Sequence, residues 1–414
     1  MNKIIRDPIH GDIKIEGIFL DFLEAPEIQR LYNIKQLGFA HLVFPGGHHT
    51  RLEHSLGTYF MSVKACEILE LNDEEKELVS CAAFLHDIGH GPFSHTLESI
   101  LRKALNVDHI DLTEKLILGK YAIFNDDEKK IIEPVTIFEI LKDHDVNHHK
   151  IIDIIKGNGK DYLSQFLNSP VDVDQLDYLM RDAYYTGVAY GLIDAERFLN
   201  SLTIMNGVLG IFKKGVSVVE NILMARTLMY SSVYFHKTVR IAELMLSKAI
   251  ELSEDFHPFE FFKMTDDELI SNLKNMGVFQ HEIAVRLKYR KLFKQAYAPS
   301  YVELSADHID FIKKFDDIEF RRNKEVEFEN KLSIQRGHVI IDFPNTEIRL
   351  NEPRIDKTGI IVFDNNHCKN LDDFTPISRA IRSRFITDWA VMIITDEKYR
   401  NIVENTQDVI MLTA

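Results

Sequence analysis

Apolar residues recur at helical spacing from about residue 27 to residue 300, and this periodicity predicts a mainly α body. Residues 1–24 differ, because their apolar and polar positions alternate as in short strands around a turn at His10-Gly11-Asp12. The pattern shows no internal repeat and no long linker rich in proline, serine or glycine. Any domain boundary is therefore expected within an ordered segment.

Two later stretches predict β structure. Between Leu202 and Phe212, Asn206-Gly207 separates two short apolar runs, which is typical of a hairpin with a two-residue turn. Between Lys331 and Phe363, short β-branched runs are broken by prolines and a glycine. We therefore expect a helical core with short hairpins over residues 1–300 and a small α+β region over residues 301–414.

Composition and charge narrow the class of protein. The 414 residues are 45% hydrophobic and 27% charged, as in an ordinary globular protein. The 49 lysines and arginines against 64 aspartates and glutamates give a net charge of −15, which argues against a general nucleic-acid binder. Three cysteines, Cys66, Cys81 and Cys368, are too few for a disulfide framework. No apolar run has the length of a signal peptide core or a membrane span, so we expect a cytoplasmic protein.

The first group of chemically useful residues lies at a predicted helix start. Thr50 and Glu53 are spaced as a capping box, and an apolar stripe continues the helix beyond them. Arg51 and His54 then share one face of the first turn, three residues apart. Free backbone N–H groups and partial positive charge at a helix N-terminus make this a favourable place for a phosphate.

A second helix is expected from Asn72, where Glu75 completes another capping box, to Gly89. Its last turn carries His86 and Asp87. An imidazole beside a carboxylate is a mixed nitrogen and oxygen donor set for a divalent ion such as Mn, Fe, Mg, Zn or Ni. The same dipeptide also occurs where a histidine and an aspartate only cap the end of a helix and bind no metal.

Histidines accumulate directly after this helix, which favours metal or phosphate chemistry. His90 and His95 follow in a glycine-containing loop, both within nine residues of His86. An imidazole there can donate to a phosphate oxygen or pass a proton to a leaving oxygen near neutral pH. His109 is expected to orient one of these rings through a carboxylate such as Glu98.

Two further groups lie on predicted helix faces. Counting about 100° per residue places Asp174 on one side of Val171–Asp182 together with Tyr178, Arg181 and Asp182, so Asp174 is positioned to supply another metal carboxylate. On the helical segment Glu220–Leu252, an aromatic and cationic stripe suits a nucleotide base and its phosphates, and it consists of Arg226, Tyr230, Tyr234 and Lys237. A solvated face, or an amphipathic helix with snorkelling cations, would show the same patterns.

Together, His54, His86-Asp87 and Asp174 resemble the H…HD…D signature of HD-domain metal-dependent phosphohydrolases. More narrowly, the chain resembles the dNTP triphosphohydrolases of that family, which include the vertebrate SAM-and-HD-domain enzyme and shorter bacterial relatives. The resemblance rests on DPIHGDI at 7–13, IKQLGFAHLVFPGG at 34–47, RLEHSLG at 51–57, LHDIGHGPFSH at 85–95, VDVDQLDYLMRDAYYTG at 171–187 and YFHK at 234–237. It covers residues 1–300, is loose over the C-terminal hundred residues, and includes no SAM domain.

This resemblance implies hydrolysis of a dNTP to the deoxynucleoside and inorganic triphosphate by attack at the α-phosphorus. It implies that a divalent metal ion is held by His54, His86, Asp87 and Asp174. The catalytic residue it implies is His95, supported by His109 and Glu98.

The same resemblance assigns eight residues to the substrate. Those that match contacts to the phosphates are Arg51, His90, Arg226 and Lys237. Those that match contacts to the sugar are Gln36, Tyr178, Asp182 and Tyr234. Gln175 stands where the vertebrate enzyme has a lysine, so one charge contact to the triphosphate is missing.

An allosteric nucleotide site is expected at Glu24, Gln29, Tyr32, Arg290 and Lys294. Tyr32 stands where the family has an arginine that reads a guanine base, so we expect an altered base preference. The resemblance also implies a homotetramer.

Two other functions fit the same residues. One is an HD phosphohydrolase that acts on another nucleotide, such as an NTP, an NMP or a signalling nucleotide. The other is a non-catalytic nucleotide sensor, which would bind its ligand without metal-dependent turnover.

Overall fold

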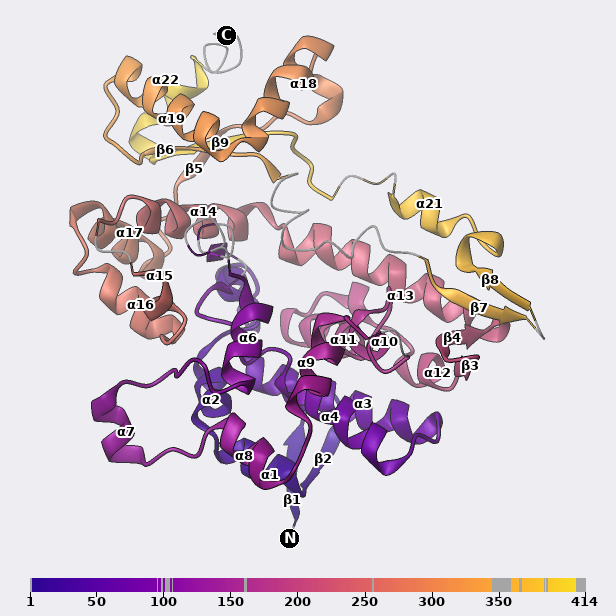
Figure 1. Ribbon diagram of the computed structural model, residues 1–414. Helices are drawn as coiled ribbons and strands as arrows, with labels where there is room; N and C mark the ends of the chain where they lie inside the picture. Colours follow the sequence, from indigo (N-terminus) through magenta and orange to yellow (C-terminus); the bar gives the residue numbers. More distant parts are fainter. Residues whose placement is uncertain are drawn as a thin grey trace.

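The computed structural model describes residues 2–94, 96, 97, 100, 105, 107–159, 162–254, 257–344, 359–364, 367–382, 384 and 386–406. Helices dominate it, which confirms the predicted mainly α class with short β-hairpins and a small α+β C-terminal part (Figure 1). In Figure 1 the N-terminal hairpin and the C-terminal three-stranded sheet lie at opposite ends of the molecule, with the helical body between them. No helix among the described residues combines the length and the apolar character needed to cross a bilayer.

The chain begins with the antiparallel hairpin of β1 (Asn2–Asp7) and β2 (Gly11–Glu16). The turn occupies residues 8–10, so its predicted position at residues 10–12 is wrong. The physical reason is the Asp7 carboxylate, which accepts the backbone N–H groups of Ile9 at 2.9 Å and His10 at 2.8 Å and closes the turn early. Gly11, with a φ of 77°, then pairs with Asp7 as the first residue of β2.

A bundle of helices follows the hairpin. The helices and 3₁₀ turns are α1 (Ile18–Glu24), α2 (Pro26–Gln29), η1 (Arg30–Asn33), η2 (Gly38–Leu42), α3 (Arg51–Ile68), α4 (Asp73–Leu85), α6 (His109–Ile117), α7 (Asp126–Ile132), α8 (Ile137–Asp143), α9 (His148–Lys156), α10 (Gln165–Asn168), α11 (Val173–Thr186), η3 (Ala189–Gly191) and α12 (Ala195–Leu199). Both predicted capping boxes are present, at the starts of α3 and α4. α4 ends at Leu85, short of the predicted Gly89, so His86 and Asp87 lie in the turn after it.

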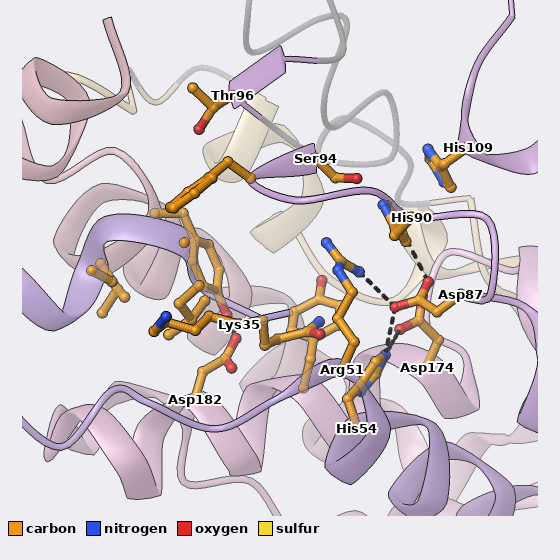
Figure 2. A pocket seen from close by; sticks show the side chains of 18 of the residues that line it. Lys35, Arg51, His54, Asp87, His90, Ser94, Thr96, His109, Asp174 and Asp182 are labelled. Atoms are coloured by element: carbon orange, nitrogen blue, oxygen red, sulfur yellow. Dashed lines mark hydrogen bonds and ion pairs between the residues drawn. The ribbon is translucent and has the colours of Figure 1, made fainter. Parts of the chain in front are cut away.

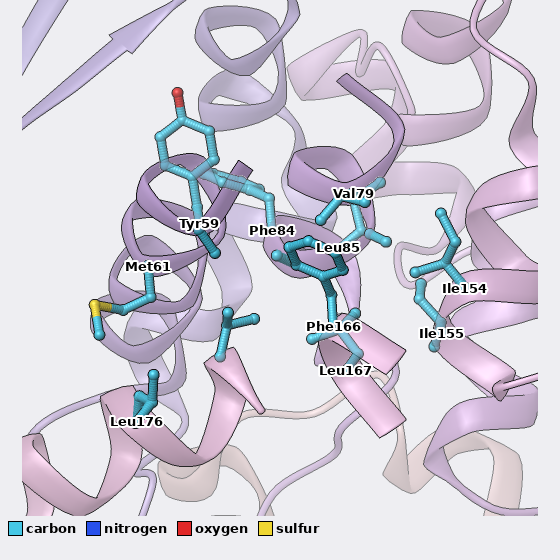
Figure 3. Packing of buried hydrophobic residues seen from close by; sticks show 14 of the residues in the cluster. Tyr59, Met61, Val79, Phe84, Leu85, Ile154, Ile155, Phe166, Leu167 and Leu176 are labelled. Atoms are coloured by element: carbon cyan, nitrogen blue, oxygen red, sulfur yellow. The ribbon is translucent and has the colours of Figure 1, made fainter. Parts of the chain in front are cut away.

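The core of this bundle fixes the helices that carry the predicted metal ligands. Figure 3 shows side chains of α3 and α4 packed against those of α9, α10 and α11. The labelled members are Tyr59, Met61, Val79, Phe84, Leu85, Ile154, Ile155, Phe166, Leu167 and Leu176, and all of them are buried. Because close-packed interiors transmit small displacements, this core holds α3, α4 and α11 in one relative position.

The second half of the body contains α13 (Val216–Met229), the π-helical turn η5 (Tyr230–Tyr234), α14 (Lys237–Glu251), α15 (Pro258–Phe261), α16 (Asp266–Leu273) and α17 (Val278–Lys288). The prediction of one helix over residues 220–252 is therefore wrong. The backbone N–H of Phe235 donates to the carbonyl of Tyr230, five residues back, at 2.9 Å. This wider turn shifts the angular position of every later side chain, so a 100° count cannot be carried across it.

The predicted hairpin is confirmed as β3 (Leu202–Met205) and β4 (Val208–Phe212), with positive φ at both Asn206 and Gly207. The short 3₁₀ turn η4 (Lys213–Gly215) follows. Two C-terminal strands extend this hairpin, since β7 (Ile361–Asp364) lies parallel to β4 and β8 (His367–Asn370) pairs with β7. The result is a four-stranded sheet in the order β3-β4-β7-β8, seen beside α12 and α13 in Figure 1.

A second sheet has the order β5-β9-β6, built from β5 (Lys294–Tyr297), β6 (Val339–Asp342) and β9 (Met392–Thr395). The other elements of this region are η6 (Tyr301–Glu303), α18 (Ala306–Ile312), η7 (Lys313–Asp316), α19 (Ile318–Leu332), η8 (Leu371–Asp373), α21 (Ile377–Arg382), η9 (Glu397–Tyr399) and α22 (Arg400–Glu404). The carboxylate of Asp342 joins the sheet to α14, because it accepts from Arg240 at 2.9 Å and from the indole of Trp389 at 3.0 Å. The predicted division of the chain at residue 300 stays a prediction.

The three cysteines differ in their exposure, and we expect one of them to react in the native protein. Cys66 and Cys81 are buried and Cys368 is exposed. Burial raises the pKa of Cys66 to about 12 and that of Cys81 well above its ordinary value, so neither forms the reactive thiolate. A thiol reagent at pH 8 should label one cysteine in the native protein and all three after unfolding. Cys368→Ser should remove the fast reaction, and fast labelling of two thiols in the native protein would contradict this burial.

Candidate metal centre and active-site pocket

At the candidate metal centre, hydrogen bonds made by the Nδ1 atoms orient the rings of two histidines. The Nδ1 of His54, in the first turn of α3, donates to the carboxylate of Asp177 at 2.8 Å. The Nδ1 of His86 donates to the carbonyl of Ala83 at 2.9 Å. Each ring can therefore turn its Nε2 to a metal ion, which at His54 would displace the hydrogen that Nε2 directs at Asp174. The Nε2 of His86 is buried, and no hydrogen-bond partner reaches it among the described residues.

Two carboxylates complete the group. An oxygen of Asp174, in the first turn of α11, lies 3.1 Å from the Nε2 of His54 and 3.8 Å from the Nε2 of His86. Asp87 lies 3.2 Å from the Nε2 of His86 and accepts from Arg51 at 2.7 Å. Figure 2 shows His54, Asp87, Asp174 and Arg51 converging, with dashed lines from Arg51 to Asp87 and from His54 to Asp174. The structure thus brings together the four predicted metal ligands from three separate parts of the chain.

The charges of the group favour a bound cation. Burial alone would raise the pKa of Asp87, but His86, His90 and Arg51 hold that pKa well below its ordinary value. Burial lowers the pKa of His54, but hydrogen bonds and charges of Asp174 and Asp177 outweigh burial and raise it to about 10. The carboxylates therefore attract positive charge to this end of the pocket.

The donor set fits a divalent metal ion. Donor atoms of His54, His86 and Asp87 all lie within 4.8 Å of one another, and the oxygen of Asp174 faces the same space. Two imidazole nitrogens with two carboxylate oxygens suit Mn, Fe, Zn or Ni, and Mg less well because it prefers oxygen.

His90 and His109 lie beside this centre. Their rings stack at a centroid distance of 4.0 Å and an angle of 13°, and His90 also lies 3.2 Å from Asp87. Burial, Arg51 and His109 lower the pKa of His90 well below that of a free imidazole. The ring is therefore neutral at pH 7. The predicted catalytic residues His95 and Glu98 lie outside the described residues, so only their neighbours Ser94 and Thr96 can be placed.

The metal centre forms one end of a cavity of about 400 Å³. Six of the eight predicted substrate residues line it, namely Gln36, Arg51, His90, Tyr178, Asp182 and Tyr234. In Figure 2, Asp182 and Lys35 lie on the other side of Arg51 from Asp87 and Asp174. Asp182 accepts from Tyr234 at 2.6 Å and from His49 at 2.8 Å, and the rings of Tyr178 and Tyr234 meet edge to face. The cavity therefore has a charged end and an aromatic end.

The other two predicted substrate residues do not line the cavity. Arg226 is fully buried and donates to the carbonyl of Pro170 at 2.9 Å and to the amide oxygen of Gln175 at 3.2 Å. The ammonium group of Lys237 lies 5.4 Å from the ring centre of Trp389. Lys237 follows the π turn and the extended residue His236, so the helical count does not carry to it. Arg226 precedes the turn and is held out of the cavity wall by its contacts with Pro170 and Gln175.

The residues predicted to bind an allosteric nucleotide are dispersed. Glu24 and Gln29 line a second cavity of about 960 Å³ between the first helices and the region of α7. Tyr32 is exposed, Arg290 donates to the carbonyl of Leu42 at 2.8 Å, and Lys294 lies 3.9 Å from Glu397. The carboxylates that line the second cavity are Asp21, Glu24, Glu128, Glu133, Asp143 and Glu268.

The sequence analysis missed residues that hold the pocket together through the main chain. Asp266, at the start of α16, accepts the backbone N–H groups of Lys35 at 3.0 Å and Phe93 at 3.2 Å. Arg30 donates to the carbonyls of Ile88 at 3.0 Å and His90 at 2.8 Å. These buried charges fix the loop that carries His90. No sequence motif identifies Asp266 and Arg30 as part of the site. Their partners are backbone atoms, which every residue type has, so the contacts leave no pattern in the sequence.

Comparison with protein families decides the family of this chain. A model described as the HD domain matches residues 51–181, and a model described as the HD associated region matches residues 193–413, more than half of the chain. The chain belongs to the HD-domain family. The HD model spans all four candidate metal ligands of the centre described above. This HD-domain chain therefore belongs to the class of metal-dependent phosphohydrolases.

Relatives of this HD-domain protein include both uncharacterised and named proteins. It is 32% identical to the uncharacterized protein MJ1154 of Methanocaldococcus jannaschii, over 97% of this chain and 81% of that protein. It is 29% identical to the deoxynucleoside triphosphate triphosphohydrolase SAMHD1 homolog of Dictyostelium discoideum, over 65% of this chain and 54% of that protein. A crystal structure of a phosphohydrolase from Bacteroides thetaiotaomicron superimposes with a TM-score of 0.69 at 26% identity, over 96% of this chain and 100% of the other. The chain thus spans only about half of the named triphosphohydrolase relative.

Proposed function

We propose that this HD-domain protein hydrolyses a deoxynucleoside triphosphate to the deoxynucleoside and inorganic triphosphate. The observation that carries the proposal is a complete two-histidine, two-aspartate group at one end of a cavity whose other end is walled by Tyr178, Tyr234 and Asp182. The similarity to a named deoxynucleoside triphosphate triphosphohydrolase supports the choice of substrate.

In the proposed reaction the oxygen of one water molecule bonds to the α-phosphorus and releases a proton to solvent, and the bond from that phosphorus to the 5′-oxygen breaks. His54, His86, Asp87 and Asp174 would hold the metal ion, which activates water and neutralises developing charge when bound. Arg51, fixed by its contact with Asp87 at 2.7 Å, places a permanent positive charge beside the phosphates. The leaving 5′-oxygen takes a proton, and His95 is the proposed donor, with His109 and Glu98 as its supports.

The aromatic end would bind the sugar. The Asp182 carboxylate, held by Tyr234 and His49, is a fixed acceptor for a sugar hydroxyl, and Gln36 lines the cavity with it. Tyr178 and Tyr234 would pack against the deoxyribose and leave little room for a 2′-hydroxyl. Arg226 and Lys237 would reach the phosphates only after leaving their present partners, Gln175 and Trp389.

Product analysis tests this function. The purified protein is incubated with Mn²⁺ or Mg²⁺ and each dNTP or NTP, and nucleoside, monophosphate and tripolyphosphate are separated. We expect deoxynucleoside and intact tripolyphosphate in equal amounts, because cleavage at the α-phosphorus leaves the three phosphates joined. Stepwise phosphate release, or turnover of ribonucleotides alone, would identify a different HD phosphohydrolase. Nucleotide binding without any product would identify a sensor.

Nucleotide activation and a homotetramer form the regulatory part of the proposal. Glu24, Gln29, Tyr32, Arg290 and Lys294 are the proposed contacts of an activating nucleotide. Rates measured with and without each added NTP test the activation, and rates that no nucleotide changes would reject it. Light scattering of the active sample tests the tetramer.

A further inference from the structure

A buried cluster behind the candidate metal centre includes a residue of the N-terminal hairpin. The carboxylate of Asp177, on α11, accepts from His54 with one oxygen at 2.8 Å and from His10 with the other at 2.6 Å. Arg181, one helical turn later, donates to both oxygens at 2.9 Å. The side chains of His10, Asp177 and Arg181 are 4%, 0% and 0% exposed. Because an ionised carboxylate only accepts, the ring nitrogens that face it carry hydrogens.

The hairpin turn is built to deliver His10 to this cluster. One oxygen of Asp7 accepts the backbone N–H groups of Ile9 and His10, which closes the turn. The other oxygen accepts from Arg181 at 2.8 Å. Asp7 therefore links two parts of the cluster. It binds the turn backbone that carries His10, and it also binds Arg181, the arginine that holds Asp177. The segment DPIHGDI thus serves to place His10 in the cluster.

The α3 backbone closes the remaining side of the cluster. A Cβ atom on Gly57 would lie 1.8 Å from a carboxylate oxygen of Asp177 and 2.5 Å from the guanidinium of Arg181. The ring of His10 also packs on Phe60 of the same helix, with centroids 4.8 Å apart. Asp177 is thus confined by α3, α11 and the hairpin together, and its orientation sets the ring plane of His54.

We propose that His10 is a positioning residue of the metal centre, which acts through Asp177 on the ring of His54. The inference rests on the proposed role of His54 as a metal ligand. Without the donor of His10, Asp177 keeps both contacts from Arg181 and the wall of α3 but loses the contact from the hairpin. A small rotation of the carboxylate toward the vacated side then turns the Nε2 of His54 with it. Removing a partner that orients a metal-bound histidine typically weakens metal binding by about 10- to 100-fold.

Two substitutions separate the hydrogen bond of His10 from its packing. His10→Phe keeps an aromatic ring against Phe60 and removes the donor, whereas His10→Gln keeps an N–H donor at similar reach and removes the ring. The matched control is His144→Phe, because His144 makes a similar contact with Asp21 at 2.7 Å on an exposed surface. The readouts are the dissociation constant of the full chain for Mn²⁺ and Co²⁺ by equilibrium dialysis, and the visible absorption spectrum of bound Co²⁺.

We expect His10→Phe to bind both ions about tenfold more weakly, the lower end of that range because His10 acts through Asp177, and to change the Co²⁺ spectrum. His10→Gln should restore most of the affinity, and His144→Phe should match the wild-type protein. Wild-type affinity and spectrum in His10→Phe would overturn the inference and leave the proposed function standing. Equal losses in His10→Phe and His10→Gln would assign the effect to packing and would also overturn it. A wild-type protein that binds neither ion would overturn the metal centre itself.

Discussion

Asp174→Ala is expected to abolish metal binding and turnover together. The carboxylate of Asp174 is the donor that α11 contributes, and it lies 3.1 Å from the Nε2 of His54. A catalytic metal contributes several kcal/mol of charge stabilisation in the transition state. Loss of about 4 kcal/mol corresponds to roughly 10³-fold in rate, at 1.36 kcal/mol for each factor of ten. His54→Ala should have the same two effects.

Metal content by elemental analysis and dNTP turnover are measured on the same preparation of Asp174→Ala. Asp153→Ala is a suitable control, because Asp153 is an exposed aspartate on α9 and should retain both properties. Folding is checked by the thermal unfolding transition of each variant. Retained turnover in a folded Asp174→Ala protein would contradict the assignment of the metal ligands.

Asp177→Ala is expected to have the largest effect on stability. Among the described residues it leaves the fully buried guanidinium of Arg181 with Asp7 as its acidic partner, and it removes the acceptor of both His54 and His10. Breaking a buried ion pair by removing one partner typically costs about 3–5 kcal/mol, because the other charge stays buried. Urea unfolding of the metal-free protein measures this cost as a lower midpoint at an unchanged slope.

An exposed ion pair on the same hairpin provides the matched control. Arg6 and Asp12 lie 2.8 Å apart, with side chains 77% and 61% exposed. Surface pairs of this kind contribute little to stability because water screens their charges, so Asp12→Ala should shift the urea midpoint only slightly. Equal shifts in Asp12→Ala and Asp177→Ala would show that the buried cluster contributes no more than a surface contact.

Local sequence signals predicted the parts of the site that depend on local structure. Capping boxes located the starts of α3 and α4, and therefore placed His54 near a helix N-terminus. They carry no information on where a helix ends, and the predicted last turn with His86 and Asp87 lies beyond the end of α4. Asp174 was predicted from the periodicity of a single helix. These features depend on residues within one or two turns, which is the range over which helical spacing carries information.

The same periodic count failed where the backbone departed from an α-helix. The π turn at Tyr230–Tyr234 and the extended residue His236 separate the faces of α13 and α14, so Lys237 lies outside the cavity that Tyr234 lines. Asp177 was missed for a different reason. It lies beside the predicted face of α11, and its importance comes from His10, which is 167 positions earlier in the chain.

The parallel pairing of β7 with β4 also bears on any shortened form of the protein. About 150 residues of sequence separate these two strands, and they pair at two positions, Ile211 with Val362 and Phe212 with Phe363. A chain cut after residue 300 would leave β4 with unpaired backbone N–H and C=O groups along one side. Unpaired strand edges readily recruit strands from other molecules, so such a fragment is expected to aggregate. We therefore expect residues 1–300 to need the C-terminal strands in order to stay in solution.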